Sequence, residues 1–369
     1  MAASVRIGPW RRPHNGSSRL PVHRERPMLD RRRLLQAVLA LALPAPLFAQ
    51  ERANLVESAR KEGSVALATS VSAAGFPRFL QAFMAKYPGI DATHGLYSAP
   101  TGRVLARVDA EMQARALTFD VLHVASLAPY LAMARKGQLL GYRSPELAAY
   151  PPDAATGQWA IARIVGVIMA YNKNVLAPAK APKAWMDLLR PEFKGRKLII
   201  QDSAAGTAFN QMYILEKQLG ADFMRKWGAQ EPVIVATSAQ LIDMLVRGEA
   251  LVGATVDHFR AFEADAVKAG IVAIYPSEGM PVAVAPAAIF KDAPHPNAAR
   301  LFVDYMLSEE GQNLIAIDIF GAYSMRRGVR TPAGQLPLSE TKPLLPTDLA
   351  DYEKAAQNFP ETFEKYFKS

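Results

Sequence analysis

The sequence predicts an α/β fold in which mostly parallel strands form sheets covered by helices on both faces. Short apolar segments of strand type alternate with amphipathic helical segments along most of the chain, an order typical of parallel sheets. Of the 369 residues, the 320 after residue 49 exceed what one hydrophobic core usually supports, so we expect two domains. The chain has no cysteine, which excludes disulfides, thiolate metal sites and cysteine nucleophiles.

Residues 28–50, MLDRRRLLQAVLALALPAPLFAQ, predict an export signal. Arginines at 31–33 form its basic region, an apolar run follows at 34–43, and Ala49 ends a plausible cleavage site. The apolar run is shorter than the roughly 20 residues that a transmembrane helix needs. The arginines also fit a twin-arginine signal, and the choice between this route and the general secretory route stays open.

We therefore expect residues 1–49 to be a disordered extension plus a signal cleaved near Ala49, with Met28 as the true start. The expected location is the periplasm, and the expected form is a soluble monomer. The first 49 residues hold nine arginines and two acidic residues, so the net charge of +9 falls to +2 for residues 50–369. This near-neutral remainder gives no support for nucleic acid as a partner.

The elements after the signal begin with a buried strand at residues 64–68. A helix then starts at Phe76 with Pro77 near its first position, presents an apolar face as far as Tyr87, and stops at Pro88. The same alternation continues with strands 90–96 and 119–124, and with helices 102–114 and 127–136.

A second alternating series follows and indicates a second α/β unit. Its expected strands are 161–171, 197–200, 233–235, 251–255, 271–274 and 282–289. Its expected helices are 185–189, 206–219, 239–247, 297–307 and a helical tail from residue 348 to the end.

Seven segments, in this order, resemble those of the substrate-binding proteins of ABC importers, in the group that includes the ferric-ion-binding proteins. They are AFMAKYPGI (82–90), TFDVLHV (118–124), KGQLLGYRSPE (136–146), VIMAYNKNVL (167–176), APKAWMDLLRPEFKGR (181–196), RGEALVGATVDHF (247–259) and HPNAARLFVDYMLSEEGQ (295–312). The resemblance covers nearly the whole chain after the signal.

The resemblance implies a two-lobed periplasmic-binding-protein fold, type II-like, with a ligand cleft between the lobes. Crossing strands are expected near 158–168 and 272–285. The expected division is lobe 1 at 50–160 and 275–345, lobe 2 at 161–274, and a C-terminal helical tail at 346–369.

Binding residues in open α/β sheets lie in the loops at the carboxyl ends of the strands. The loop 202–209 follows one expected strand and opens a helix, so amides near Gly206, Thr207 and Ala208 would favour an anion. A similar turn cradles an anion in the resembled family. Ser203 or Thr207 would otherwise serve only to cap the helix.

Further candidates follow other strands or precede helices, and each has a capping or turn role as its alternative. They are Thr69, Ser70, Ser72, Ser98, Thr101, Ser126, Thr237 and Ser238. The resemblance adds Asp257 and His258, and a rim loop in which Arg326 or Arg327 would close on a carboxylate or phosphonate.

Ferric iron fits these positions poorly. The iron ligands of the family fall near Ser72 and Ala125 and on His258 and Phe259, and ferric iron requires several anionic oxygens. We therefore expect no metal and no cofactor, although an iron importer with non-standard ligands remains an alternative.

The expected function is the periplasmic solute-binding component of an ABC transporter. It would capture a small anionic organic solute, phosphonate- or phosphate-like, by hinge closure and deliver it to a permease in the inner membrane. The motifs of serine hydrolases, zinc peptidases, P-loop proteins and dinucleotide-binding enzymes are absent from the sequence, so no catalytic residues are expected. A ligand-sensing protein that feeds a signalling receptor is the alternative of another class. The identity and charge of the ligand stay open.

Overall fold

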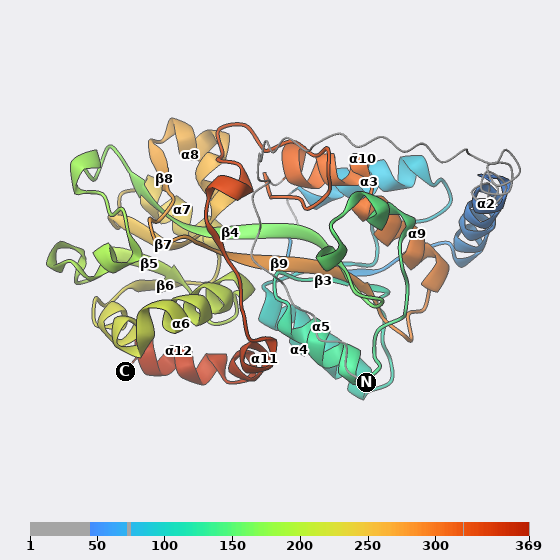
Figure 1. Ribbon diagram of the computed structural model, residues 1–369, viewed down its shortest axis with the longest axis horizontal. Helices are drawn as coiled ribbons and strands as arrows, with labels where there is room; N and C mark the ends of the chain where they lie inside the picture. The colour runs from blue at the N-terminus through green and yellow to red at the C-terminus, as the bar shows by residue number, and fades with distance from the viewer. Residues whose placement is uncertain (1–44, 72–74, 320, 369) are drawn as a thin grey trace, which may run out of the picture.

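A computed structural model describes residues 45–71, 75–319 and 321–368 and shows an elongated α/β protein (Figure 1). Its strands form one ten-stranded sheet in the order β2-β1-β3-β9-β4-β7-β5-β6, with β8 also paired to β4 and β10 to β9. Two hydrophobic clusters fill the space between this sheet and the helices. The predicted α/β fold with mostly parallel strands and flanking helices is confirmed.

The first half of the sheet contains three parallel strands, β1, β2 and β3. The bounds of its elements are α2 Ala45–Glu62, β1 Leu67–Thr69, α3 Phe76–Lys86, β2 Leu96–Ser98, α4 Thr101–Gln113, β3 Val121–His123 and α5 Ala128–Arg135. Helix α3 forms where predicted because Phe76, Phe79, Leu80 and Phe83 share one buried face.

Strand β2 is shorter than the predicted strand 90–96, and this is a correction. The Asp91 carboxylate accepts hydrogen bonds from the amides of Thr93 and His94, at 3.0 and 3.4 Å, and folds the segment into a turn. An aspartate that binds backbone amides two residues ahead competes with strand pairing. Pairing with β1 therefore begins only at Leu96.

Strands β4 (Ala160–Asn172) and β9 (Met280–Ile289) run through the middle of the molecule and join its two halves (Figure 1). They pair antiparallel with each other between residues 160–166 and 282–287. The far end of β4 pairs with β7, and the far end of β9 pairs with β3. Both strands are buried along their length, which explains their nearly continuous apolar sequence.

The second half holds β5, β6 and β7, which are parallel to one another. The bounds of its elements are β5 Leu198–Gln201, α6 Gly206–Gly228, β6 Val233–Val235, α7 Ser238–Val246, β7 Val252–Asp257, α8 Ala264–Lys268 and β8 Ile271–Ile274. Helix α6 keeps helical geometry as far as Gly220, where φ is 86° and only glycine is relaxed, and a second helical segment then continues to Gly228. The predicted end of the helix at residue 219 matches this break.

The remaining elements complete both halves. Their bounds are α9 Pro296–Leu307, α10 Glu309–Asn313, β10 Pro343–Leu344, α11 Leu349–Gln357 and α12 Phe359–Phe367.

Within the described part of the chain, none of the helices is both long and apolar enough to cross a membrane. Residues 28–44 of the predicted signal lie outside the described residues, and the predicted cleavage point at Ala49 falls within α2.

Candidate functional site

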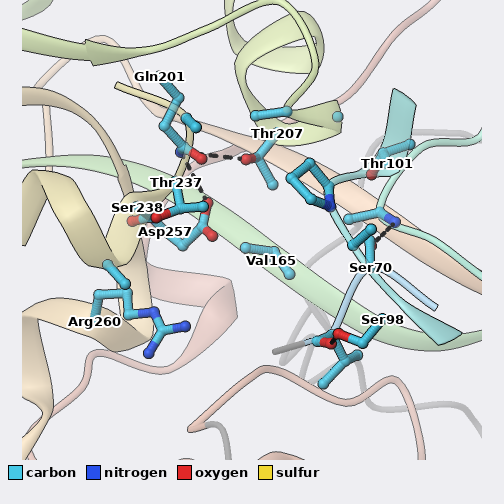
Figure 2. A pocket seen from close by; sticks show the side chains of 18 of the residues that line it. Ser70, Ser98, Thr101, Val165, Gln201, Thr207, Thr237, Ser238, Asp257 and Arg260 are labelled. Carbon is cyan, nitrogen blue, oxygen red and sulfur yellow. Dashed lines mark hydrogen bonds between the residues drawn. The ribbon is translucent and has the colours of Figure 1, made fainter. Parts of the chain in front are cut away.

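A cavity of about 380 Å³ lies where the carboxyl ends of strands from both halves meet (Figure 2). Hydroxyl groups surround it, contributed by Ser70, Ser98, Thr101, Thr207, Thr237 and Ser238. Its charged lining residues are Arg163, Asp257 and Arg260, and Gln201 adds an amide. The cavity is therefore polar and of the size of small-molecule sites in proteins.

Three helices begin at this cavity. Helix α4 starts at Thr101, α6 at Gly206 and α7 at Ser238, and all three residues line the cavity. The residues preceding α4 and α6 are Pro100 and Ala205, whose side chains cannot accept a hydrogen bond from the first-turn amides. Helix N-termini carry partial positive charge and exposed amide donors, so their convergence favours an anion.

Arg163 brings a positive charge into the cavity from the crossing strand β4. It is the lone charged residue in a 13-residue apolar strand and is only 4% exposed. Burial lowers the pKa of Arg163 to about 10, and the charge of Asp257 opposes that fall. The guanidinium therefore stays charged at neutral pH, and the charge of Asp257 beside it offsets part of the cost of burying it.

Arg260 supplies the second positive charge of the cavity. It lies in a short 3-10 helix, His258–Phe262, that follows β7. Its guanidinium forms an ion pair with Glu263 at 2.5 Å and lies 5.2 Å from the ring centre of Phe259. Its side chain is 19% exposed, so the charge is partly sheltered from water.

Asp257 is the acidic residue of the cavity and ends strand β7. Its Oδ1 atom lies 3.4 Å from Nε2 of Gln201, and its amide donates to Oγ of Ser238 at 3.0 Å. Burial raises the pKa of Asp257, and a hydrogen bond from Thr207 and the charges of the two arginines oppose the rise. The lining residues contribute two guanidinium groups and one carboxyl group, and Glu263 outside the lining pairs with Arg260.

Several predicted residues line this cavity and others do not. Ser70, Thr101, Gly206, Thr207, Ser238 and Asp257 line it, as do Ser98 and Thr237. Thr69 is fully buried below it and donates to the carbonyl oxygen of His123 at 2.9 Å. Ala208 is also fully buried, inside the first turn of α6. Ser72 lies outside the described residues.

Ser126 and Ser203 lie at a neighbouring cavity of about 330 Å³, on the side of α6 that faces the C-terminal helices. The two cavities share Thr101 and Gly206 in their walls.

His258 turns away from the cavity. Its Nδ1 atom accepts a hydrogen bond from the amide of Gly166 at 3.0 Å, and its ring stacks on Tyr323 with centroids 4.3 Å apart. Burial lowers the pKa of His258 to about 3, so the ring is neutral. His258 thus holds β4 rather than a ligand, because its acceptor nitrogen is already used.

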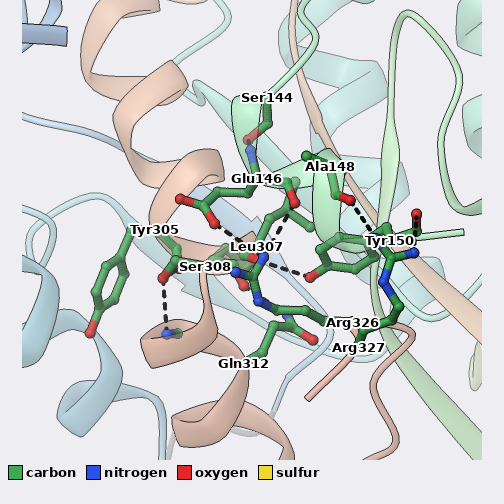
Figure 3. A network of polar contacts seen from close by, with 12 residues as sticks. Ser144, Glu146, Ala148, Tyr150, Tyr305, Leu307, Ser308, Gln312, Arg326 and Arg327 are labelled. Atoms are coloured by element: carbon green, nitrogen blue, oxygen red, sulfur yellow. Dashed lines mark hydrogen bonds and ion pairs between the residues drawn. The ribbon is translucent and has the colours of Figure 1, made fainter. Parts of the chain in front are cut away.

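The rim arginines are also engaged elsewhere, which corrects the expectation for them (Figure 3). Arg326 forms an ion pair with Glu146 at 3.1 Å and donates to the Leu307 carbonyl oxygen at 3.2 Å. Arg327 donates to the Ala148 carbonyl oxygen at 2.6 Å. Neither residue lines the cavity, because the backbone of a neighbouring segment takes their hydrogen bonds.

Arg163, Arg260 and Gln201 line the cavity although none of them was predicted from the sequence. A signal for Arg163 was present, because a lone charge within a long apolar strand is rare unless it is paired or functional. Arg260 follows β7 by three residues and fell within the segment that the strand-end rule covers. Gln201 lies between the predicted strand 197–200 and the predicted loop 202–209, and only the fold turns its amide into the cavity.

Two halves that meet around a polar cavity at the carboxyl ends of their strands define a two-lobed binding protein. The chain belongs to the family of bacterial extracellular solute-binding proteins, which matches residues 130–354. An uncharacterized protein of Haemophilus influenzae is 28% identical over 235 residues, which are 58% of this chain and 65% of that relative. The chain thus spans just under two thirds of the length of that curated relative.

Solved structures share the fold. Iron-bound HitA from Pseudomonas aeruginosa is 24% identical, with a TM-score of 0.71 over 81% of this chain and 99% of that one. AfuA from Actinobacillus pleuropneumoniae, with fructose-6-phosphate bound, is 21% identical, with a TM-score of 0.72 over 83% of this chain and 99% of that one. The predicted resemblance to periplasmic substrate-binding proteins is confirmed.

Proposed function

We propose that this protein is the solute-binding component of an ABC transporter and carries a small organic anion to a membrane permease. The observation that carries the proposal is the meeting of Arg163, Arg260 and three helix N-termini around one cavity. Each charge-assisted hydrogen bond contributes about 1.5–3 kcal/mol, so a few of them account for micromolar affinity after ordering costs.

The size of the cavity favours an organic solute over a bare ion. A volume of about 380 Å³ equals that of roughly a dozen water molecules, at about 30 Å³ each. A single metal ion or inorganic oxoanion would leave most of this space to water. Apolar lining from Val71, Val165 and Phe259 suits the carbon skeleton of a larger solute.

Asp257 suggests a second property of the solute. A carboxylate inside a cavity built for an anion repels an anionic group unless that group presents a hydrogen-bond donor. We therefore infer that the solute carries a hydroxyl, an amino group or a protonated acid oxygen opposite Asp257. A phosphorylated or phosphonate compound with such a donor meets both requirements.

Iron is a weaker fit to the same lining. Ala125 and Phe259 line the cavity and have no oxygen in their side chains, and His258 uses Nδ1 to hold Gly166. Among the described residues, no group of three or more histidine, aspartate and glutamate side chains is placed to hold a metal ion. The geometry therefore supports an anion better than a ferric ion.

The proposal takes the two halves of the sheet as lobes, with residues 50–160 and 275–345 in one and 161–274 in the other. Opening about β4 and β9 would admit the solute, and closure would bring the α4 and α6 termini together around it. Closure requires a solute that contacts both lobes, because only a difference in affinity between the two states shifts their equilibrium. We also infer export to the periplasm, where such solutes are captured.

A thermal-shift panel on the purified protein tests the function. It would include phosphate esters, phosphonates, carboxylates, polyamines, and ferric iron with citrate. A ligand at 100 times its Kd stabilises the fold by about 2.7 kcal/mol, which raises Tm by several degrees. A shift with a hydroxylated or amino-bearing organic anion supports the proposal, whereas a shift with ferric iron alone would overturn it.

A further inference from the structure

The C-terminal helix α12 is anchored to α6 in the second half of the molecule. Phe359 packs on Phe209 and Phe367 on Trp227, with ring centroids 5.1 and 5.2 Å apart. At Gly228 of α6 an added Cβ atom would lie 1.7 Å from a carbonyl oxygen of α12, so only glycine permits this approach. Close packing over this length makes the C-terminal segment move with α6.

Helix α11 reaches from this anchor to the other half of the molecule and lies between α6 and α5 (Figure 1). Both terminal nitrogens of Arg135, the last residue of α5, contact the two carboxylate oxygens of Glu353 in α11. The Glu353 side chain is 6% exposed, although Arg135 is largely in solvent. Two-pronged contacts of this kind are stronger and more directional than ordinary surface ion pairs.

Tyr352 adds a second link beside the ion pair and is 1% exposed. Its hydroxyl donates to Oδ1 of Asn210 in α6 at 3.2 Å, and the amide group of Asn210 donates to Val282 of β9 at 2.7 Å. Burial raises the pKa of Tyr352 to about 12, against hydrogen bonds from Ser126 and the amide of Leu127. One hydroxyl thus connects α6 with the loop that follows β3.

These contacts lead us to propose that α11 and α12 form an interlobe latch that holds the lobes closed even without solute. The segment is fixed to one lobe by aromatic packing and reaches the other through Glu353 and Tyr352. The loop that Tyr352 contacts continues from Ala125, which lines the cavity. The latch therefore sets solute affinity from outside the cavity, because it changes the population of the closed form. This inference rests on the proposed function, since it takes the two halves to be moving lobes.

A distance measurement on the full chain without solute tests the latch. Gln113→Cys and Lys197→Cys place spin labels on exposed residues of the two halves, and the chain has no cysteine of its own. The variant Arg135→Met/Glu353→Gln removes both charges and leaves no buried carboxylate unpaired. We expect longer label distances and a closed-to-open ratio lowered roughly five- to tenfold, the low end of measured site couplings.

Two further variants make the result specific. Arg135→Lys keeps the charge but cannot make the two-pronged contact, so it should give a smaller shift in the same direction. Asp222→Asn/Lys226→Met removes an exposed ion pair within α6 and should leave the distances unchanged. Unchanged or shorter distances in the Arg135→Met/Glu353→Gln variant would overturn the latch. Because no solute is present, this outcome is independent of the ligand panel that tests the proposed function.

Discussion

Gly102 and Ala204 join the two halves of the molecule through a main-chain hydrogen bond of 3.0 Å, with the Gly102 amide as donor. Gly102 lies in the first turn of α4 and Ala204 precedes α6, so the bond crosses the gap between the proposed lobes. Both residues line the cavity beside the C-terminal helices. The structure therefore shows the proposed lobes in contact.

Gly206 is the residue on which this contact depends most. A Cβ atom added there would lie 2.5 Å from the carbonyl oxygen of Ala125 and 2.9 Å from Oγ1 of Thr101. We predict that Gly206→Ala forces the halves apart and weakens solute binding by about tenfold or more, the equivalent of 1.4 kcal/mol. Calorimetric titration with the solute found in the panel measures this change.

The same substitution should also lower folding stability, because the added Cβ atom clashes with backbone in the contact between the halves, and this strain outweighs the gain of about 0.4–1 kcal/mol that alanine brings to a helix. Gly157→Ala is the matched control, since an added Cβ atom there meets open space. Unchanged affinity in Gly206→Ala would show that closure does not use this contact.

Arg163→Met should abolish most of the affinity for an anionic solute. Loss of a charge-assisted hydrogen bond costs about 1.5–3 kcal/mol, or roughly ten- to hundredfold in Kd. Folding stability should fall as well, because the substitution takes a charge partner away from the buried carboxyl group of Asp257. Equal Kd values for the variant and the parent chain would show that Arg163 does not bind the solute.

Asp257 should make the unfolding free energy of the chain decrease as pH rises above the ordinary pKa of an aspartate. Burial raises its pKa above the ordinary value of 3.8, so the folded chain favours the protonated carboxyl. The stability gained is complete below about pH 3.8 and is lost as pH rises through the raised pKa. Relative to the parent chain, Asp257→Asn should therefore gain unfolding free energy as pH rises. A difference that is flat with pH in urea unfolding would contradict this.

Asp257→Asn also separates two kinds of solute. An anion without a donor should bind the variant more tightly, because a like charge has been removed. An anion that donates a hydrogen bond to Asp257 should bind it more weakly, by about 1.5–3 kcal/mol. Titration of one solute of each kind distinguishes them, and equal effects on both would contradict the donor requirement.

Arg52→Met should destabilise the fold without affecting the cavity. Arg52 in α2 pairs with Asp304, whose side chain is fully buried and also accepts from Tyr142 at 2.9 Å. Breaking a buried pair costs about 3–5 kcal/mol, and we expect about 1–3 here because Arg52 is 35% exposed. Urea unfolding measures the loss.

Lys86→Met is the control for Arg52, because it breaks the exposed pair with Glu310 and should cost less than about 1 kcal/mol. Similar losses for the two variants would mean that burial of Asp304 does not matter.

The fold was predictable because its local patterns agree with its tertiary structure. The spacing of apolar residues predicts the buried face of α3, and the continuous apolar run predicts the buried strand β4. The strand predicted from residue 90 was wrong because Asp91 accepts a hydrogen bond from the amide of Thr93 and forms a turn there. The predicted end of the helix at residue 219 is right, because Gly220 interrupts the helical backbone before the segment continues to Gly228.

The site was predictable only in part. The strand-end rule found the hydroxyl groups and the α6 terminus, since topology alone places them. The rule could not find Arg163, because this residue lies within a strand. Arg326 was predicted to bind the solute, but it forms an ion pair with Glu146 instead. Which polar side chain satisfies which partner depends on contacts far apart in the chain.

Arg163 lies on β4, the segment about which opening would occur, rather than on either face that closes. Its position should therefore change little between the open and closed forms, while Arg260 and the helix termini approach only on closure. We expect a solute to meet this charge first, which makes the encounter rate sensitive to ionic strength. The later contacts would then govern how long the solute stays.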